Sequence, residues 1–189
     1  MLRCDDQAYM PDDNEPVPSE EECFRILKNA QTPAKVIGHC TRVAELSCSI
    51  GSYLLKSGCP LNLDLIKAAA LLHDIAKGKP CHAQTGAVML GKYPGVARIV
   101  AEHTDICWNS NQPLTEKAIV YLADKLVAED RIITLEERFG GPLEKHKNDV
   151  VVAKKVRQRL SNAEGIRTKI EEIIKMPLHD IWKAELGRY

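Results

Sequence analysis

Helical periodicity is the dominant pattern along this chain. In residues 34–57, apolar side chains and His39 recur at intervals of three and four, the spacing that places them on one helix face. Gly58 follows directly, as is typical beyond a helix end. Residues 62–77 are apolar on almost every side between Leu65 and Leu72, so we expect that helix to occupy the centre of a bundle.

Further helices are predicted on both sides of this pair. Ser19 and Glu22 have the spacing of a capping box and predict a short helix that begins at residue 19. Polar or proline-containing breaks separate four more candidate helices, at residues 82–93, 95–104, 115–131 and 147–175. The last of these is either one long helix or two abutting helices. No segment shows convincing period-2 alternation with turn residues. The pattern therefore predicts an all-α fold.

Composition changes at both ends of the chain. Residues 1–18 are rich in acidic residues and prolines, which indicates a linker or disordered tail. The composition also changes after Arg131, and residues 144–189 hold eleven Lys or Arg against seven Asp or Glu. We therefore expect a main domain at 19–139 and a C-terminal helical extension at 140–189.

The overall composition excludes some classes of protein. The 26 basic and 26 acidic residues cancel, so charge does not indicate a nucleic-acid partner. No apolar run approaches the roughly 18 residues of a membrane span, and the N-terminus has no apolar signal region. The seven cysteines include no C-x-x-C pair, so we expect reduced thiols rather than a disulfide framework. These features predict a cytoplasmic protein that is not bound to a membrane.

Six histidines and aspartates occupy inner faces or ends of the predicted helices: His39, His73, Asp74, His82, His103 and Asp124. A lone histidine on an apolar face is usually a hydrogen-bonded core residue. Burying a lone carboxylate is costly, however, and several such side chains together indicate a shared partner. A divalent metal would be such a partner.

The order of these residues resembles a known signature. His39, "LLHDIAK" at 71–77 and "YLADK" at 121–125 resemble the H…HD…D signature of the HD-domain phosphohydrolase superfamily, over about residues 34–131. The resemblance implies an all-α HD-domain helical bundle with a C-terminal helical extension. A second "HD" pair, His179-Asp180, lacks the preceding apolar run, and we predict that it lies on the surface.

Two finer resemblances refine this interpretation. His82 with Gly86 and Ala87, the pair His103-Thr104, and Arg131 are similar to features of the YqeK-like dinuclear branch, which includes symmetrical dinucleoside-tetraphosphate hydrolases. Residues 2–13 and 120–139 resemble the junction and HD module found behind MobA-like nucleotidyltransferase domains. The second resemblance implies a link to a nucleotidyltransferase domain. The sequence leaves open whether the chain forms a homo-oligomer.

The resemblance implies metal-assisted hydrolysis of a nucleotide or another small phosphate ester. Asp74 would bridge two transition-metal ions (Fe, Mn or Co) that share a hydroxide. His39, His73 and Asp124 would bind one ion, and His82 and His103 the other.

Basic residues would complete this site. Lys77 would act beside Asp74 in catalysis and neutralise phosphate charge, unless it is only a helix-terminal lysine. Arg131 and Arg42 are further candidates for substrate binding. Two alternatives carry the same ligand set: a mixed-valence di-iron oxygenase of the HD type, and a nucleotide-binding regulatory module.

Overall fold

Helices account for nearly all regular structure in this protein. The computed structural model describes residues 15–186, with side chains as far as Lys183. The N-terminal part contributes α1 (Glu20–Asn29), α2 (Ala34–Lys56), α3 (Leu63–Leu72), α4 (His82–Met89) and α5 (Pro94–Glu102). The remainder contributes α6 (Glu116–Lys125), α7 (Leu135–Lys145), α8 (Val150–Ile174) and α9 (Leu178–Leu186). The predicted all-α class is confirmed.

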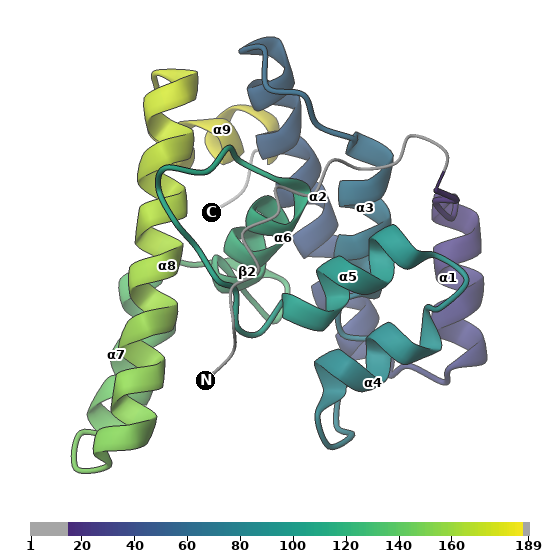
Figure 1. Ribbon diagram of the computed structural model, residues 1–189, viewed down its shortest axis with the longest axis horizontal. Coiled ribbons are helices and arrows are strands. Elements are labelled where there is room, and N and C mark those ends of the chain that lie inside the picture. The colour runs from purple at the N-terminus through teal and green to yellow at the C-terminus, as the bar shows by residue number, and fades with distance from the viewer. Residues whose placement is uncertain (1–14, 187–189) are drawn as a thin grey trace.

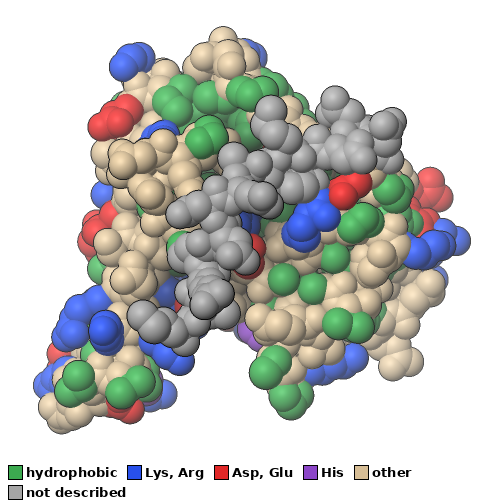
Figure 2. Space-filling model, in the orientation of Figure 1, with side chains coloured by type: hydrophobic (Ala, Val, Ile, Leu, Met, Phe, Trp, Pro, Cys, Tyr) green, Lys and Arg blue, Asp and Glu red, His purple; other side chains and the backbone are tan. Residues whose placement is uncertain are grey.

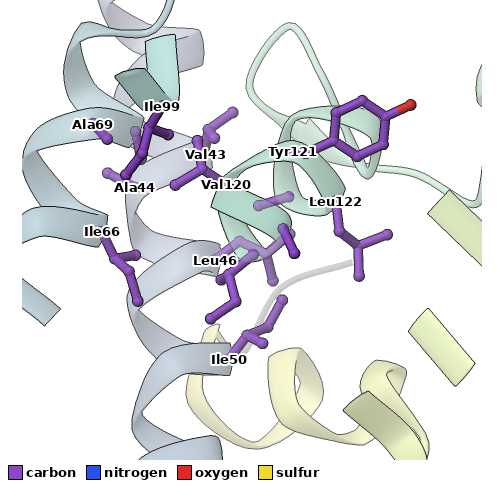
Figure 3. Close-up of a cluster of buried hydrophobic side chains, with 14 of the residues drawn as sticks. Val43, Ala44, Leu46, Ile50, Ile66, Ala69, Ile99, Val120, Tyr121 and Leu122 are labelled. Carbon is purple, nitrogen blue, oxygen red and sulfur yellow. The ribbon is translucent and has the colours of Figure 1, made fainter. Parts of the chain in front are cut away.

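The helices share one hydrophobic core. In Figure 1, α8 runs along one side of the molecule and α1 along the other, with α2, α3, α5 and α6 between them. Figure 3 shows side chains of these inner helices meeting in the core, among them Leu46, Ile66 and Val120. Phe139, Ile166 and Ile181 of the last three helices belong to the same buried cluster. The C-terminal helices therefore pack directly on the bundle.

Three helices end several residues earlier than the sequence pattern predicts: α3, α6 and α4, which ends at Met89 instead of residue 93. α3 ends at Leu72 instead of residue 77, because i to i−3 hydrogen bonds from Ile75 and Lys77 replace the helical pattern. Gly78, at φ +89°, completes this turn. Asn62 caps the start of α3 through a hydrogen bond that its side chain accepts from the backbone of Leu65. The early end at Leu72 leaves the His73-Asp74 pair in a buried turn.

The predicted helix at 115–131 is also too long, because α6 ends at Lys125. The chain then forms a small antiparallel hairpin, β1 (Val127–Ala128) and β2 (Arg131–Ile132). Glu129 has a left-handed backbone conformation at the hairpin turn, and Arg42 Nε donates to the carbonyl of Asp130 at 2.9 Å. The predicted helix is therefore wrong beyond Lys125, where a residue with positive φ permits a tight turn.

The structure bears on several of the predicted segment boundaries. Residues 2–13 and most of the predicted tail at 1–18 lie outside the described residues. α7 continues across residue 139, where we expect the main domain to end. α8 is one continuous helix within residues 147–175. His179 and Asp180 lie on α9 with about half of each side chain exposed, as predicted for a surface pair.

The cysteines are not all reduced thiols. Cys23 and Cys40 are free and buried, whereas the free thiol of Cys81 is exposed. Cys107 is disulfide-bonded, which corrects the expectation for that residue. Sequence spacing does not reveal a cysteine pair that only the fold brings together. Within residues 15–186, none of the helices has the length and apolar character needed to cross a membrane.

Candidate metal centre

The six predicted ligands come together from five helices and one turn. His39 lies on α2, His82 opens α4, and Asp124 lies on α6. His73 and His103 cap the C-terminal ends of α3 and α5, and Asp74 follows His73 in the turn. Their donor atoms form two groups, within each of which the atoms lie within 4.8 Å of one another. One group is His39, His73 and Asp124, and the other is Asp74, His82 and His103.

Backbone carbonyls orient two of the imidazoles. Nδ1 of His73 lies 2.7 Å from the carbonyl oxygen of Ala70, and Nδ1 of His103 lies 2.7 Å from that of Val100. A carbonyl only accepts hydrogen bonds, so each Nδ1 carries the proton and each Nε2 presents a lone pair. Both Nε2 atoms face the cluster of carboxylates and histidines. Metal-bound histidines in proteins are commonly held by such a second hydrogen bond.

Several of these donor atoms lack a protein partner. Nε2 of His73 and Oδ1 of Asp74 are buried without a hydrogen bond. Oδ1 of Asp74 lies 3.4 Å from Nε2 of His82 and 3.3 Å from Nε2 of His103. The two Nε2 atoms of His82 and His103 are 3.2 Å apart. Unsatisfied buried acceptors are rare in folded proteins, and a cation would satisfy this set.

Asp124 connects the other group to the hairpin. Its Oδ1 lies 3.1 Å from Nε2 of His39 and 3.5 Å from Nε2 of His73. Nδ1 of His39 lies 3.1 Å from the carbonyl oxygen of Glu129. That carbonyl orients the His39 ring as Ala70 and Val100 orient their histidines. The hairpin that the sequence pattern missed therefore positions one of the predicted ligands.

Packing brings α4 close enough for His82 to reach the cluster. A Cβ atom on Gly86 would lie 3.2 Å from side-chain carbons of both Ile75 and Val100. Glycine at this position therefore allows α4 to approach the turn after α3 and the face of α5. The glycine of the H-x-x-x-G-A pattern has a packing role, and it places the first residue of α4 beside Asp74.

The electrostatics of the carboxylates and of two histidines favour the protonation states that metal ligands require. Burial raises the pKa of Asp74, but the nearby His103, His73 and Lys77 side chains outweigh burial and hold that pKa well below its usual range. Burial also raises the pKa of Asp124, yet the charge of Lys125 and the nearby His39 and His73 side chains lower it strongly. Burial lowers the pKa values of His82 and His103, and neighbouring histidines lower them further. At neutral pH the two carboxylates are therefore ionised and His82 and His103 are neutral, as metal binding needs. His73 differs, because burial lowers its pKa but Cys40, Asp124 and Asp74 outweigh burial and raise that pKa well above its ordinary value in the ion-free protein.

Sequence analysis missed Lys125, which is almost fully buried. Its Nζ donates to Oδ2 of Asp124 at 2.7 Å and to the carbonyl of His103 at 3.0 Å. The ammonium also lies 4.6 Å from the centre of the Tyr121 ring. Lys125 thus links a residue of each ligand group. The signal was a lysine directly after an aspartate on an otherwise apolar helix.

Three of the six ligands, His82, His103 and Asp124, line a cavity of about 320 Å³ between the bundle and the last helices. Its lining includes ligands, cations and apolar side chains: Lys77, His82, His103, Thr104, Asp124, Lys125, Arg138, Phe139, Pro142, Val156 and Arg159. Figure 2 shows Lys and Arg side chains gathered over the lower ends of α7 and α8. The cavity combines a metal-ligand cluster with a cationic outer wall.

The three predicted substrate-binding cations are placed differently. Lys77 lines the cavity, and its half-exposed ammonium donates to Oδ2 of Asp74 at 2.7 Å. Arg42 contacts Glu45 and the backbone of Asp130, and it is not part of the cavity lining. Arg131 is exposed on β2 and also lies outside that lining. Because α3 ends at Leu72, Lys77 is not at a helix terminus, and its role as a helix cap has no structural basis.

The match to a known protein family covers the residues of this centre. Residues 36–129, which include all six predicted ligands, match the HD domain family. The chain is also similar to a tRNA (cytidine(56)-2'-O)-methyltransferase of Picrophilus torridus, with 31% identity over 169 residues. That similarity covers 79% of this chain and 48% of that protein, so the chain spans about half the length of the curated relative. No solved structure matches the chain significantly.

The YqeK-like branch and the link to a nucleotidyltransferase domain stay predictions. The fold is mostly helical, which is consistent with an HD domain, and the His and Asp side chains form groups that could hold a divalent metal. Together with the match over residues 36–129, these features support the assignment of the chain to the HD superfamily.

Proposed function

We propose that this protein is a metal-dependent phosphohydrolase that acts on a nucleotide or another small phosphate ester. The observation that carries the proposal is the pair of donor groups that come together at Asp74, with one or two members of each group lining a cavity that also holds four cationic side chains. Imidazole and carboxylate donors suit divalent transition metals such as Fe, Mn or Co. When bound, two such ions would act as Lewis acids on a phosphoryl group and make water a stronger nucleophile at neutral pH.

The residues of the chain have distinct tasks in this proposal. His39, His73 and Asp124 would hold one ion and His82 and His103 the other, with Asp74 beside both groups. Oδ1 of Asp74 faces His82 and His103, whereas Oδ2 lies 3.5 Å from Nε2 of His73. The two oxygens of one carboxylate therefore point to different groups, which supports a bridging role.

Lys77 is the candidate for contact with the phosphoryl group. Its ammonium lies next to Asp74 and lines the cavity, with half of the side chain exposed. An exposed ammonium at this position can neutralise negative charge that develops during phosphoryl transfer. Lys125 is buried and fully engaged with Asp124 and His103, so we assign it a positioning role.

The relative also supports a phosphate-bearing substrate. It is named as an enzyme that acts on tRNA, a polymer with a phosphate backbone, and this chain matches 48% of its length. The methyl-transfer activity is not carried over to this chain. Dinucleoside polyphosphates are the finer expectation from the YqeK-like resemblance.

Phosphate release tests the proposal. Protein purified without oxygen and loaded with Fe, Mn or Co is incubated with nucleoside mono-, di- and triphosphates and with dinucleoside polyphosphates. We expect phosphate release from at least one compound and its loss with a chelator. Oxygen consumption with oxidised product and no phosphate would favour the di-iron oxygenase. Binding without any turnover would favour the regulatory module.

A further inference from the structure

Arg138 differs from the other cations that line the cavity. Lys77 and Lys125 each donate to a metal-centre carboxylate at 2.7 Å. Arg159 forms two hydrogen bonds to Asp105, at 2.6 and 2.7 Å. Within residues 15–183, none of the carboxylates lies within ion-pair distance of the Arg138 guanidinium. Arg138 is thus the cavity cation that has no acidic partner in the described part of the chain.

The backbone of Arg138 is held in place by its neighbours. Thr134 and Glu137 form a capping box at the start of α7. Phe139, the next residue, is 5% exposed and belongs to the hydrophobic core. Arg138 therefore projects from an anchored helical turn and is itself partly buried. A binding residue on such a turn loses little conformational freedom when a ligand arrives.

The chemistry of this position favours a phosphate group as ligand. A guanidinium presents five donors in a planar fork that matches phosphate oxygens, and its charge persists at every physiological pH. Burying it partly without a counter-anion is costly, and an anionic ligand would remove that cost. The metal ligands His82, His103 and Asp124 line the same cavity. At about 320 Å³, its volume lies within the range of small-molecule sites.

We propose that Arg138 binds a phosphate group of the substrate other than the one at the metal centre. The inference rests on the proposed function, which places the reacting phosphoryl group beside Asp74 and Lys77. The substrate class is then a compound with at least two phosphate groups, such as a nucleoside diphosphate. α7 thereby acts as a specificity element for the chemistry of the bundle.

Binding of two related nucleotides tests this role without turnover. The metal-loaded protein is titrated calorimetrically with AMP and with α,β-methylene-ADP, whose bridging carbon prevents hydrolysis between its phosphates. We expect the parent protein to bind α,β-methylene-ADP more tightly than AMP. Arg138→Gln should weaken α,β-methylene-ADP binding at least tenfold and AMP binding less than twofold. Arg138→Lys, which keeps the charge but loses the fork, should fall between the parent and Arg138→Gln.

Arg157→Gln is the matched control, because Arg157 is exposed on α8 and is not part of the cavity lining. It should bind both nucleotides like the parent. Binding of α,β-methylene-ADP by Arg138→Gln that equals the parent, or a parent that does not prefer it over AMP, would overturn the inference. Selective loss in Arg138→Gln without phosphate release from any substrate would uphold Arg138 and refute hydrolysis. Hydrolysis that is unchanged by Arg138→Gln would refute the role of Arg138 and uphold the proposed hydrolysis.

Discussion

The two walls of the cavity are built on different principles. On the bundle side, His103 and Asp124 are at most 5% exposed, and a backbone carbonyl at the end of α5 orients the imidazole of His103. On the outer side, Arg138 and Arg159 are partly exposed, and α8 is tied to residues 103–114 by side-chain contacts. The bundle wall fixes the geometry of the donor atoms, whereas the outer wall supplies charge and shape. We infer that the first wall sets the reaction and the second selects the substrate.

Replacing Asp74 should produce the largest effect on the bundle wall. Asp74→Asn keeps the volume of the side chain but removes the charge on which both donor groups converge. Changing a residue that only supports a metal ligand typically costs 10–100-fold, so we expect a loss of more than about a hundredfold in metal affinity and in hydrolysis. Metal analysis and phosphate detection measure these two quantities, and circular dichroism should show unchanged helix content.

His179→Ala is the control for that experiment, because its "HD" pair lies on the surface of α9. It should alter neither metal content nor hydrolysis. Equal losses in both variants would contradict the assignment of the metal centre to the pair at residues 73 and 74.

Lys77→Met should give the next largest effect and tests the boundary between the two walls. Methionine keeps much of the aliphatic stem and removes the charge beside Asp74. We expect at least a tenfold fall in kcat/KM, which is about 1.4 kcal/mol of transition-state stabilisation, with metal content unchanged. A variant that loses metal and activity together would instead show that the ammonium positions Asp74.

Asn162→Ala should loosen the outer wall without abolishing the chemistry. Nδ2 of Asn162 donates to the buried carbonyl of Ile106 at 2.7 Å, and that carbonyl would lose its partner. Leaving a buried polar group unsatisfied costs about 1–3 kcal/mol of folding free energy, which denaturant unfolding would measure. Glu164→Ala, at an exposed position of α8, should be nearly neutral. Equal stability of the two variants would refute the role of Asn162 as a tie.

The smallest predicted effect concerns the ion pair between Arg159 and Asp105. The hydrogen bond from Arg159 lowers the pKa of Asp105, so the folded chain keeps this carboxylate charged at pH values where the unfolded chain protonates it. The stabilisation is therefore present above the ordinary aspartate pKa of about 3.9 and is lost as pH falls through the lowered pKa. Both side chains are more than a third exposed, so water screens the pair. We therefore expect Arg159→Gln to lower the free energy of unfolding by less than about 1 kcal/mol at pH 7. Unfolding curves should show this difference shrinking below pH 4, and a constant difference would count against the pair.

The sequence predicted the metal-binding side of the cavity better than the outer side. His39, the His73-Asp74 pair and Asp124 stood out because polar side chains on apolar helix faces break a strong periodic pattern. The hairpin after α6 escaped detection because two-residue strands are too short to show alternation. Yet its Glu129 carbonyl orients His39. Arg138 could not be identified, because an arginine on an amphipathic helix resembles any solvated cation until the fold turns that face toward a cavity. Arg42 and Arg131 illustrate the converse, since the fold leaves both outside the cavity lining.

Metal stoichiometry is the most direct test of the central claim that two groups of donors meet at Asp74. Protein purified without oxygen is stripped with a chelator, reconstituted with excess Fe or Mn, freed of unbound metal and analysed for ions per chain. The two donor groups predict about two ions per chain in the parent protein and a marked loss in Asp74→Asn. Recovery of one ion or fewer in the fully loaded parent would contradict the claim, and His82 and His103 would then be structural histidines.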